Sequence, residues 1–275
     1  MTKQIKYLPI TFGRDMENQE ISYFSEHYRA LPRGVATRLG VAAHTLGQGT
    51  ALIVSDVDVL AFNRVIGLGL DAPATEAQLD ELTGLYEAAG TSRFFIQLSK
   101  IAERPALLHL LEAKGFSHYN NWAKLYRRVQ PLPEIQTGLR AATIGAGSRD
   151  TFADVILRSF QWPEALRPLL ANPVGRPGWK HYLAYDGQEP VAAAALFMRG
   201  KLASLAFAAT LPEYRGRGVQ QALIARRLRD AYEAGCRWAV AETAEDRPER
   251  PAASYRNMRR MGFELAYLRP NYLRT

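Results

Sequence analysis

Apolar residues recur along the chain with two spacings, one typical of buried strands and one typical of helices. Residues 202–210 are apolar and small, which predicts a strand, and residues 219–234 follow the helical spacing. Leu211-Pro212-Glu213-Tyr214 ends the first run, and Arg215-Gly216-Arg217-Gly218 leads into the second. The chain therefore contains a strand–loop–helix unit whose loop is rich in glycine and arginine.

The same spacings predict further elements before and after this unit. The expected helices cover residues 14–30, 75–90, 105–114, 148–160, 162–171 and 252–261. The expected strands cover residues 51–59, 63–70, 93–98, 121–129, 139–144, 179–185, 190–198, 237–243 and 263–273. Helices and strands interspersed in this way indicate the α/β (α+β) class.

Two of the helices have a predicted buried face. On the helix at 148–160 the inward residues are Phe152, Val155, Ile156 and Phe160. On the helix at 219–234 the residues expected to face the sheet are Ile224, Leu228, Ala231 and Tyr232. Its charged residues are expected to face the other way: Arg226, Arg227, Arg229, Asp230 and Glu233.

Prolines divide the chain near its middle. Pro131 and Pro133 disfavour helix and remove backbone donors, so we place a domain boundary here, between residues 1–130 and 131–275. Gly115-Phe116 and Gly262-Phe263 each follow a strand and a helix and precede an aromatic strand. They lie close to half the chain apart, which indicates a duplicated unit.

The glycine loop has the features of an anion site. Gly216 and Gly218 allow a tight turn and a close approach to a ligand, and the first amides of the following helix lack internal partners. The helix dipole favours an anion there, and Arg215 and Arg217 add positive charge. The loop is not a Walker sequence, since no Gly-Lys-Ser/Thr closes it, and the dinucleotide pattern needs a third glycine.

The corresponding helix of the first half begins differently. It opens with a Thr75-x-x-Gln78 capping box, and Pro73 and several carboxylates stand where the second half has Arg-Gly-Arg-Gly. The carboxylates are Asp71, Glu76, Asp80 and Glu81. Acidic groups at a helix N-terminus satisfy the dipole and repel phosphate. We therefore expect the first half to hold no phosphate ligand and to supply a wall, a lid or a substrate surface.

Composition narrows the function classes. The 275 residues are 47% hydrophobic, enough for well-formed cores, and the net charge of +8 comes from dispersed basic residues rather than a stripe, which argues against nucleic acid as a partner. The longest apolar run, 191–198, is too short to span a membrane, and no segment resembles a signal peptide, so we expect a soluble, cytoplasmic protein. Cys236 is the single cysteine, and the five histidines show no metal-ligand spacing, so we expect no metal.

The sequence Leu-Pro-Glu-Tyr-Arg-Gly-Arg-Gly-Val at 211–219 resembles the acetyl-CoA loop of the GNAT N-acetyltransferases, whose pattern is Arg/Gln-x-x-Gly-x-Gly/Ala. Arg215 and Gly218 match this pattern, whereas Gln220 departs from it. The order of elements extends the resemblance to a tandem GNAT protein over the full length. It implies two GNAT-like domains, each a mixed, mostly antiparallel twisted sheet flanked by helices, the first degenerate and without a CoA loop.

The resemblance also implies which residues hold acetyl-CoA, as the co-substrate. The loop and helix start that would contact it are Arg215, Gly216, Arg217, Gly218, Val219, Gln220 and Gln221. In the family the central strand splays from its neighbour, so backbone groups of Ala208, Ala209 and Thr210 would pair with the pantetheine arm. Ser254 and Asn257 match a Ser-x-x-Asn of some GNAT branches that contacts the same arm, while Pro251 replaces an expected asparagine.

Direct acetyl transfer needs a base for the amine and a donor for the leaving thiolate. The resemblance places a general base at Glu242, whose apolar neighbours would raise its pKa; the alternative is a structural or solvent-facing carboxylate. The family's usual tyrosine acid is replaced by Met258. Tyr255 lies on nearly the same helical face and is the substitute candidate, with a packing role as the alternative.

These features predict an acetyl-CoA-dependent N-acetyltransferase acting on an unidentified small-molecule or peptide amine by direct transfer. One alternative is an acetyl-CoA-binding module with little turnover, because Met258 and Pro251 depart from the family. The other is an aminoacyl-tRNA-dependent transferase of the tandem type, against which the intact pyrophosphate loop argues. The acceptor and the oligomeric state, including a homodimer, stay open.

Overall fold

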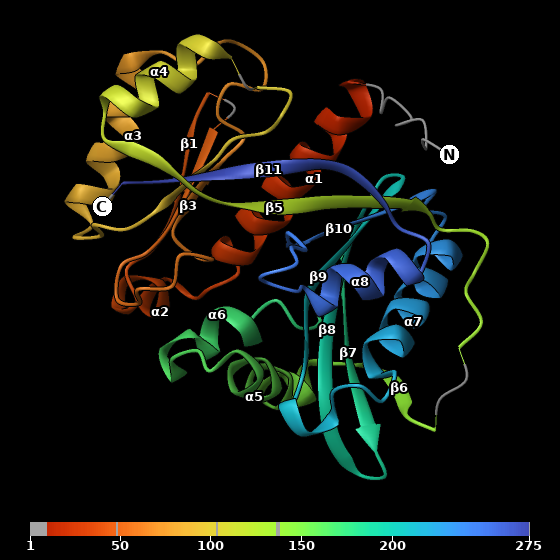
Figure 1. Cartoon of the computed structure of the whole chain (residues 1–275). Helices are drawn as coiled ribbons and strands as arrows, with labels where there is room; N and C mark the ends of the chain where they lie inside the picture. The colour runs from red at the N-terminus through yellow and green to blue at the C-terminus, as the bar shows by residue number, and fades with distance from the viewer. Residues whose placement is uncertain (1–9, 48, 103, 136–137, 275) are drawn as a thin grey trace, which may run out of the picture.

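A computed structural model describes residues 10–47, 49–102, 104–135 and 138–274 of the chain (Figure 1). The helices of the first half are α1 (Ile10–Arg29), α2 (Arg33–Arg38), α3 (Glu76–Ala88) and α4 (Pro105–Ala113). Its strands are β1 (Val41–Leu46), β2 (Gly49–Val54), β3 (Arg64–Ile66), β4 (Phe95–Gln97) and β5 (Phe116–Arg128). The capping box of α3 is present, with the Thr75 and Gln78 side chains each accepting from the other's backbone amide.

The second half has the order that the sequence predicts. Its strands are β6 (Arg140–Ile144), β7 (Trp179–Asp186), β8 (Glu189–Arg199), β9 (Leu202–Thr210), β10 (Trp238–Ala244) and β11 (Glu264–Arg274). Its α-helices are α5 (Arg149–Phe160), α6 (Arg167–Ala171), α7 (Val219–Glu233) and α8 (Ala253–Arg260). The sequence patterns predict neither α2 nor β1, because β1 is half-exposed and carries no apolar alternation.

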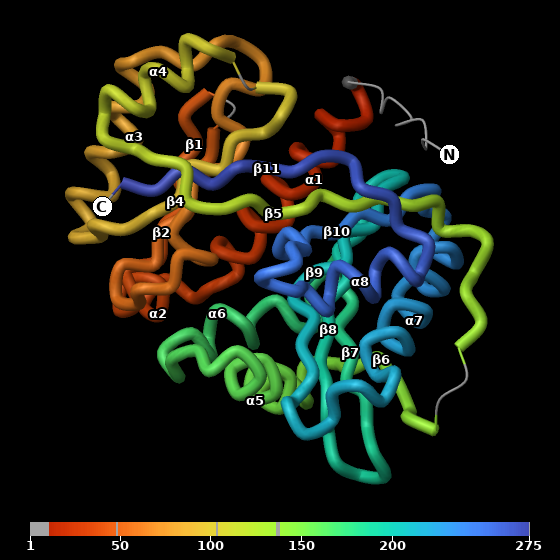
Figure 2. Tube along the Cα trace, in the orientation of Figure 1, coloured from red at the N-terminus to blue at the C-terminus, as the bar shows by residue number. Residues whose placement is uncertain are grey.

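The strands form one continuous sheet in the order β1-β2-β3-β4-β11-β5-β10-β9-β8-β7-β6, mostly antiparallel. Only the β3–β4 and β9–β10 pairs are parallel within the described residues. Each half gives its last strand to the other: β11 pairs with β4, and β5 pairs with β10. The two exchanged strands run antiparallel to each other across the middle of the molecule (Figure 2). The proposed boundary near residue 130 is thus crossed by an unbroken sheet.

Helices cover both faces of this sheet. α1, α5 and α6 pack on one face around residues such as Phe24, Phe152 and Ala195, which we call the α1/α5 core. α7 and α8 cover the other face of the second half in the α7/α8 core, and α3 and α4 cover the other face of the first half. Alternation in β2 follows this arrangement, since Leu52 faces the α1/α5 core and Ile53 the α3/α4 side.

The predicted outer face of α7 is partly wrong. Arg227 is fully buried, donating from Nε to the Leu223 carbonyl at 3.1 Å and from Nη1 to the Ala195 carbonyl at 3.2 Å. Asp230 is also buried and accepts a hydrogen bond from the Tyr182 hydroxyl at 2.7 Å. The strands beneath α7 are rich in alanine, which leaves room for long side chains that hydrogen-bond the backbone.

Two aromatic residues expected to be buried are instead exposed. Tyr232 on α7 and Phe160 at the end of α5 each leave 45% of their surface open. Each lies in the last turn of its helix, beside residues that are buried, so the ring itself is turned away from the core. Periodicity alone therefore misplaced both rings.

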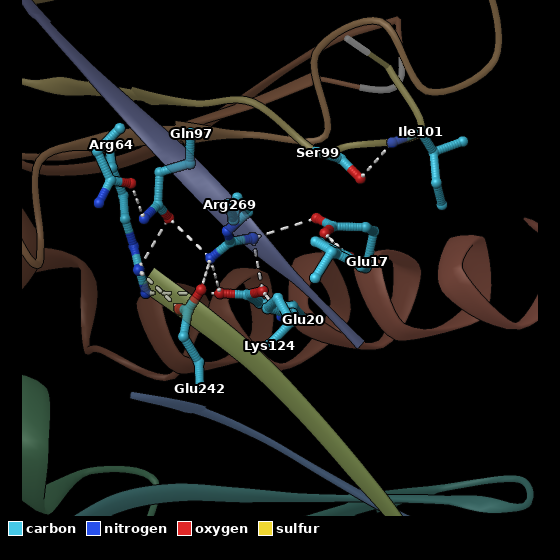
Figure 3. A network of polar contacts seen from close by, with 11 residues as sticks. Glu17, Glu20, Arg64, Gln97, Ser99, Ile101, Lys124, Glu242 and Arg269 are labelled. Atoms are coloured by element: carbon cyan, nitrogen blue, oxygen red, sulfur yellow. Dashed lines mark hydrogen bonds and ion pairs between the residues drawn. The ribbon is translucent and has the colours of Figure 1, made fainter. Parts of the chain in front are cut away.

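A buried cluster of charged side chains joins the two halves (Figure 3). Arg269 of β11 is fully buried and donates to Glu17 at 3.1 Å and to Glu20 at 2.8 and 2.9 Å, both on α1. It also donates to Glu242 of β10, and Lys124 of β5 donates to Glu20. Burial by itself would raise the pKa of Glu20, but Arg269, Lys124 and Arg64 hold it well below its usual range.

Removing the central cation of this cluster should strongly destabilise the fold. Arg269→Met leaves buried carboxylates without their main partner, and we expect a loss of about 3–5 kcal/mol in the free energy of unfolding. Arg274→Met is the matched control on the same strand, because Arg274 pairs with Glu87 at the surface, and it should cost less than about 1 kcal/mol. Denaturant unfolding measures both, and equal losses in the two variants would contradict the prediction.

Neutral histidines are buried in the α1/α5 core beside β9. His27 stacks on Phe207 at 4.7 Å between ring centroids, and His181 stacks on Trp179 at 5.5 Å. Neither ring nitrogen of His27 has a hydrogen-bond partner within the described residues. Burial, with the nearby His181, lowers the pKa of His27 to about 3, and burial lowers that of His181 to about 4.

The fold should therefore lose stability as the pH falls below the ordinary histidine pKa, where only the unfolded chain takes up the proton. For His27 the loss between pH 7 and pH 5 is about 2 kcal/mol, given an unfolded pKa near 6.5. His27→Phe keeps the stacked ring and removes this contribution. Between pH 7 and pH 5 the free energy of unfolding should therefore fall by about 2 kcal/mol more in the wild type than in the variant, as measured by denaturant unfolding. A difference that does not change with pH would show that His27 is not buried neutral.

Candidate functional site

A cavity of about 700 Å³ opens where β9 and β10 separate. The two strands pair in parallel only from Leu202 to Leu205, against Trp238 to Ala241. Beyond that point the edge of β9 that faces β10 has no strand partner among the described residues, and Ala208, Ala209 and Thr210 line the cavity. The splayed strand that the resemblance implies is therefore present.

A register shift in β9 shapes this edge. Ala209 pairs with Ala193 of β8, whereas Ala206 pairs with Ala195, so the intervening backbone bulges. Phe207 within the bulge has φ of 45°, a left-handed conformation that is strained for an aromatic residue. Its ring stacks on His27, which fixes the bulge from below. The bulge lies at the cavity, which Ala206, Phe207 and Ala208 line.

The N-terminus of α7 also opens into the cavity. Gly216 and Gly218 have φ of 79° and 76°, which explains why the loop needs glycine at both places. Gly218 is the N-cap residue, and no side chain in the described chain caps the helix. A Cβ at Gly216 would meet nothing within 4 Å, so the loop leaves open space above its backbone. Val219, Gln220 and Gln221, the first residues of α7, line the cavity.

The side chains of the two loop arginines make different contacts. Arg215 lines the cavity and donates to the carbonyls of Thr210 at 3.3 Å and Ser159 at 3.2 Å, which fastens the loop to β9 and α5. Arg217 does not line the cavity: it pairs with Asp186 at 2.8 Å and lies over the Tyr214 ring. The Arg215 side chain thus faces the cavity, whereas the Arg217 side chain is paired outside it.

Gln220, the departure from the family pattern, joins α7 to α8. Its Nε2 donates to Ser254 Oγ at 2.8 Å, and its Oε1 accepts from Asn257 Nδ2 at 2.6 Å. All three residues line the cavity. The Gln220 side chain thus leaves the glycine turn open and instead positions Ser254 and Asn257 on the wall.

Glu242 lies at the floor of the cavity, and its side chain is 12% exposed. It accepts a hydrogen bond from Arg269, and its Oε2 lies 3.6 Å from Arg64 Nη1. Burial raises the pKa of Glu242, and the nearby charge of Glu20 adds to the shift, against the opposing effect of Arg269. The carboxylate thus belongs both to the charged cluster and to the cavity.

The structure does not bring Tyr255 to this site. Its ring packs against the α7/α8 core and does not line the cavity, whereas Met258 does. A residue three positions away on a helix is rotated by about 60° from the family's position, enough here to turn the ring into the α7/α8 core. The packing role is the one that the geometry supports.

The sequence analysis predicted none of the aromatic rings that line the cavity. Phe160 was expected to be buried, and most of the rings lie on elements far apart in the chain, so no local spacing groups them. The rings are Tyr23, Phe24, Phe62, Trp122, Phe160, Trp162 and Phe207. The first half therefore supplies part of the wall.

Across the described ranges no group of three or more histidine, cysteine, aspartate or glutamate residues is placed to hold a metal ion. No helix in that part of the chain combines the length and the apolar character needed to cross a bilayer. Cys236 is a buried free thiol.

Comparisons with known proteins agree with this geometry. Residues 145–240 match the family model described as an acetyltransferase (GNAT) domain. A search of curated proteins finds no match. Among solved structures, a GCN5-related N-acetyltransferase from Kribbella flavida is 19% identical with a TM-score of 0.61, covering 88% of this chain and 94% of that one.

Two more solved structures cover almost the whole chain. A tandem GNAT protein from the clavulanic acid biosynthesis pathway is 15% identical with a TM-score of 0.56, over 94% of each chain. An acetyltransferase of the GNAT family from Novosphingobium aromaticivorans is 17% identical with a TM-score of 0.53, over 90% of this chain and 97% of that one. The family model thus identifies a GNAT acetyltransferase domain at residues 145–240, and the solved structures show that the fold over both halves is the one found in tandem GNAT proteins.

Proposed function

We propose that this protein transfers an acetyl group from acetyl-CoA directly to the nitrogen of an amine. The observation that carries the proposal is the uncapped N-terminus of α7, which opens between two glycines into a cavity beside the free edge of β9. Unpaired amides and a helix dipole suit a pyrophosphate, and free strand groups suit the amides of a pantetheine arm. Arg215 adds a cation at the same place.

The first half would take no part in cofactor binding. At the start of α3 the Thr75 and Gln78 side chains accept from the amides of Gln78 and Thr75, and Glu76 and Asp80 pair with Lys114 at 2.8 and 2.6 Å. An arriving phosphate would meet a capped helix and two carboxylates instead of free donors. The cofactor therefore belongs to the second half alone.

Glu242 is the group in the cavity that would accept the proton of the attacking amine. When bound, acetyl-CoA supplies the activated acyl group and a thiol leaving group. Glu242 lines the cavity and has a raised pKa, so it is a stronger base than an exposed carboxylate. Its bond to Arg269 fixes its orientation, and direct transfer to the amine requires no covalent enzyme intermediate.

The absence of Tyr255 from the cavity favours one second candidate, a protein that binds acetyl-CoA with little turnover. A thiol with a pKa near 8.5 can leave as a thiolate without a side-chain donor, so we rank transfer first. Release of CoA from acetyl-CoA in the presence of an amine panel separates the two. Saturable binding without release for every amine would support the binding protein.

Blocking the N-terminus of α7 should abolish cofactor binding. Gly218→Glu places a carboxylate where the pyrophosphate would sit, and we expect the Kd for acetyl-CoA to rise by about 100-fold or more, which corresponds to about 3 kcal/mol. The left-handed φ of Gly218 strains glutamate by about 1–2 kcal/mol, but a Cβ there meets only Gln221 Oε1, at 3.9 Å, so the variant should fold with a modest loss of stability. Titration calorimetry measures the Kd, with circular dichroism to check folding.

Pro73→Glu is the control, because it also introduces a glutamate, two residues before the N-cap residue of the corresponding helix of the first half. It should leave the Kd for acetyl-CoA unchanged. A loss of affinity in Pro73→Glu, or none in Gly218→Glu, would place the cofactor elsewhere.

Removing the base should slow the reaction and change its pH profile. Glu242→Gln should lower kcat/KM by roughly 100-fold or more while leaving the Kd for acetyl-CoA unchanged. Because the reaction needs the ionised carboxylate and burial raises its pKa, the wild-type rate should fall with acid at a pH above the ordinary glutamate value of 4.5. The variant should lose this acidic limb.

Glu249→Gln, an exposed residue of the following loop, is the control for a change of charge alone. It should keep both the rate and the profile. An unchanged acidic limb in Glu242→Gln would assign the proton transfer to another group.

A further inference from the structure

Aromatic rings form part of the wall of the cavity. Phe160 stacks on Trp162 at 4.5 Å with an angle of 19° between the planes, and Trp162 meets Phe62 edge-on at 5.0 Å. Phe62 comes from the loop between β2 and β3, so both halves contribute. Such a set of rings offers faces and edges to a flat ligand.

Phe160 is a lining ring that is not packed into a core. It is 45% exposed although α5 has a well-buried apolar face. Its exposed surface lies at the cavity and not on an isolated part of the surface. A large apolar side chain left open at a concave site marks a place where a ligand completes the packing.

The charged residues that line the cavity restrict the number of ammonium groups that this ligand can carry. Within the described residues, Glu242 is the single carboxylate of the lining, whereas Arg64, Arg215 and Arg260 are cations. The guanidinium of Arg64 lies between the rings of Phe24, at 4.0 Å, and Trp122, at 5.2 Å. Glu242 thus offers a partner to one ammonium group, and the other described lining residues offer no carboxylate to a second.

We propose that the acceptor is a primary monoamine on a flat, uncharged aromatic body, which stacks against Phe160 and Trp162 and presents its amine to Glu242. This deepens the acetyl-transfer proposal and rests on it for the role of the amine. Polyamines and aminoglycosides are excluded as preferred acceptors, because the wall offers their additional ammonium groups no carboxylate. The aromatic wall also gives the degenerate first half a role in recognition, through Phe24, Phe62 and Trp122.

Binding to the CoA-saturated protein tests the acceptor class without turnover. Titration calorimetry compares tryptamine and 2-phenylethylamine with butylamine, which has the same charge and no ring, and with 1,4-diaminobutane and kanamycin. We expect the aromatic monoamines to bind at least 10-fold more tightly than the other three. Equal or tighter binding of butylamine, 1,4-diaminobutane or kanamycin would overturn the proposal, as would the absence of aromatic-amine binding with and without CoA.

Phe160→Ala tests the wall itself. It should weaken tryptamine about 5- to 10-fold and leave butylamine and CoA unchanged, since an exposed ring can be removed without loss of the fold. Tyr232→Ala is the matched control, because Tyr232 has the same exposed fraction but lies outside the cavity, and it should change none of these values. Equal weakening of tryptamine and butylamine by Phe160→Ala, or the same loss in Tyr232→Ala, would contradict the inference.

A parallel assay of CoA release from acetyl-CoA keeps the two proposals apart. Aromatic amines that bind as expected but release no CoA would support the acceptor pocket and overturn acetyl transfer. CoA release with diamines, in a protein that does not bind aromatic amines, would support acetyl transfer and overturn the acceptor class.

Discussion

The exchange of β5 and β11 is the constraint on which the rest of the structure depends. Because β11 lies between β4 and β5, neither half completes its sheet with its own last strand. The exchanged strands bring Lys124 and Arg269 beside the carboxylates of α1, where three acids and three cations are buried together. Such a cluster is tolerated only when each charge is paired, which ties the position of each half to that of the other. Glu242 belongs to this cluster and to the cavity, so the candidate site depends on the contact between the halves.

The two halves use the same strand–helix–strand unit for opposite purposes. In each, parallel strands flank a helix, β3–α3–β4 in one and β9–α7–β10 in the other, and a glycine with φ of 81° then leads into the exchanged strand. The difference lies in the first turn of the helix. Thr75 and Gln78 close α3, whereas Gly218 leaves α7 open. A helix capped by its own side chains gains local stability but offers no free amides to an anion. The duplicated unit therefore has a capped helix N-terminus in the first half and an uncapped one in the second.

Local signals in the sequence were sufficient for much of this fold. The capping box of α3, the limits of β9 and the glycine loop each depend on neighbouring residues, and the structure places all three as expected. The strand exchange depends on pairing between segments far apart in the chain, which no local period encodes. The burial of Arg227 depends on alanines of strands that lie beneath it only in the folded state. Tyr255 was misplaced for a related reason, since a rotation of a few tens of degrees on α8 decides between the cavity and the core.

The charged cluster also decides which carboxylate can exchange a proton. Glu20 contacts Arg269 through both oxygens and Lys124 as well, so removing its charge would leave two buried cations poorly paired, and its pKa is held low. Burial raises the pKa of Glu242, which shares Arg269 with Glu20 and meets Arg64 only at 3.6 Å. Of these two carboxylates, Glu242 therefore takes up a proton more readily, and it is also the one that lines the cavity. The contacts that join the two halves thus also place Glu242, the carboxylate with the raised pKa, where an amine would bind.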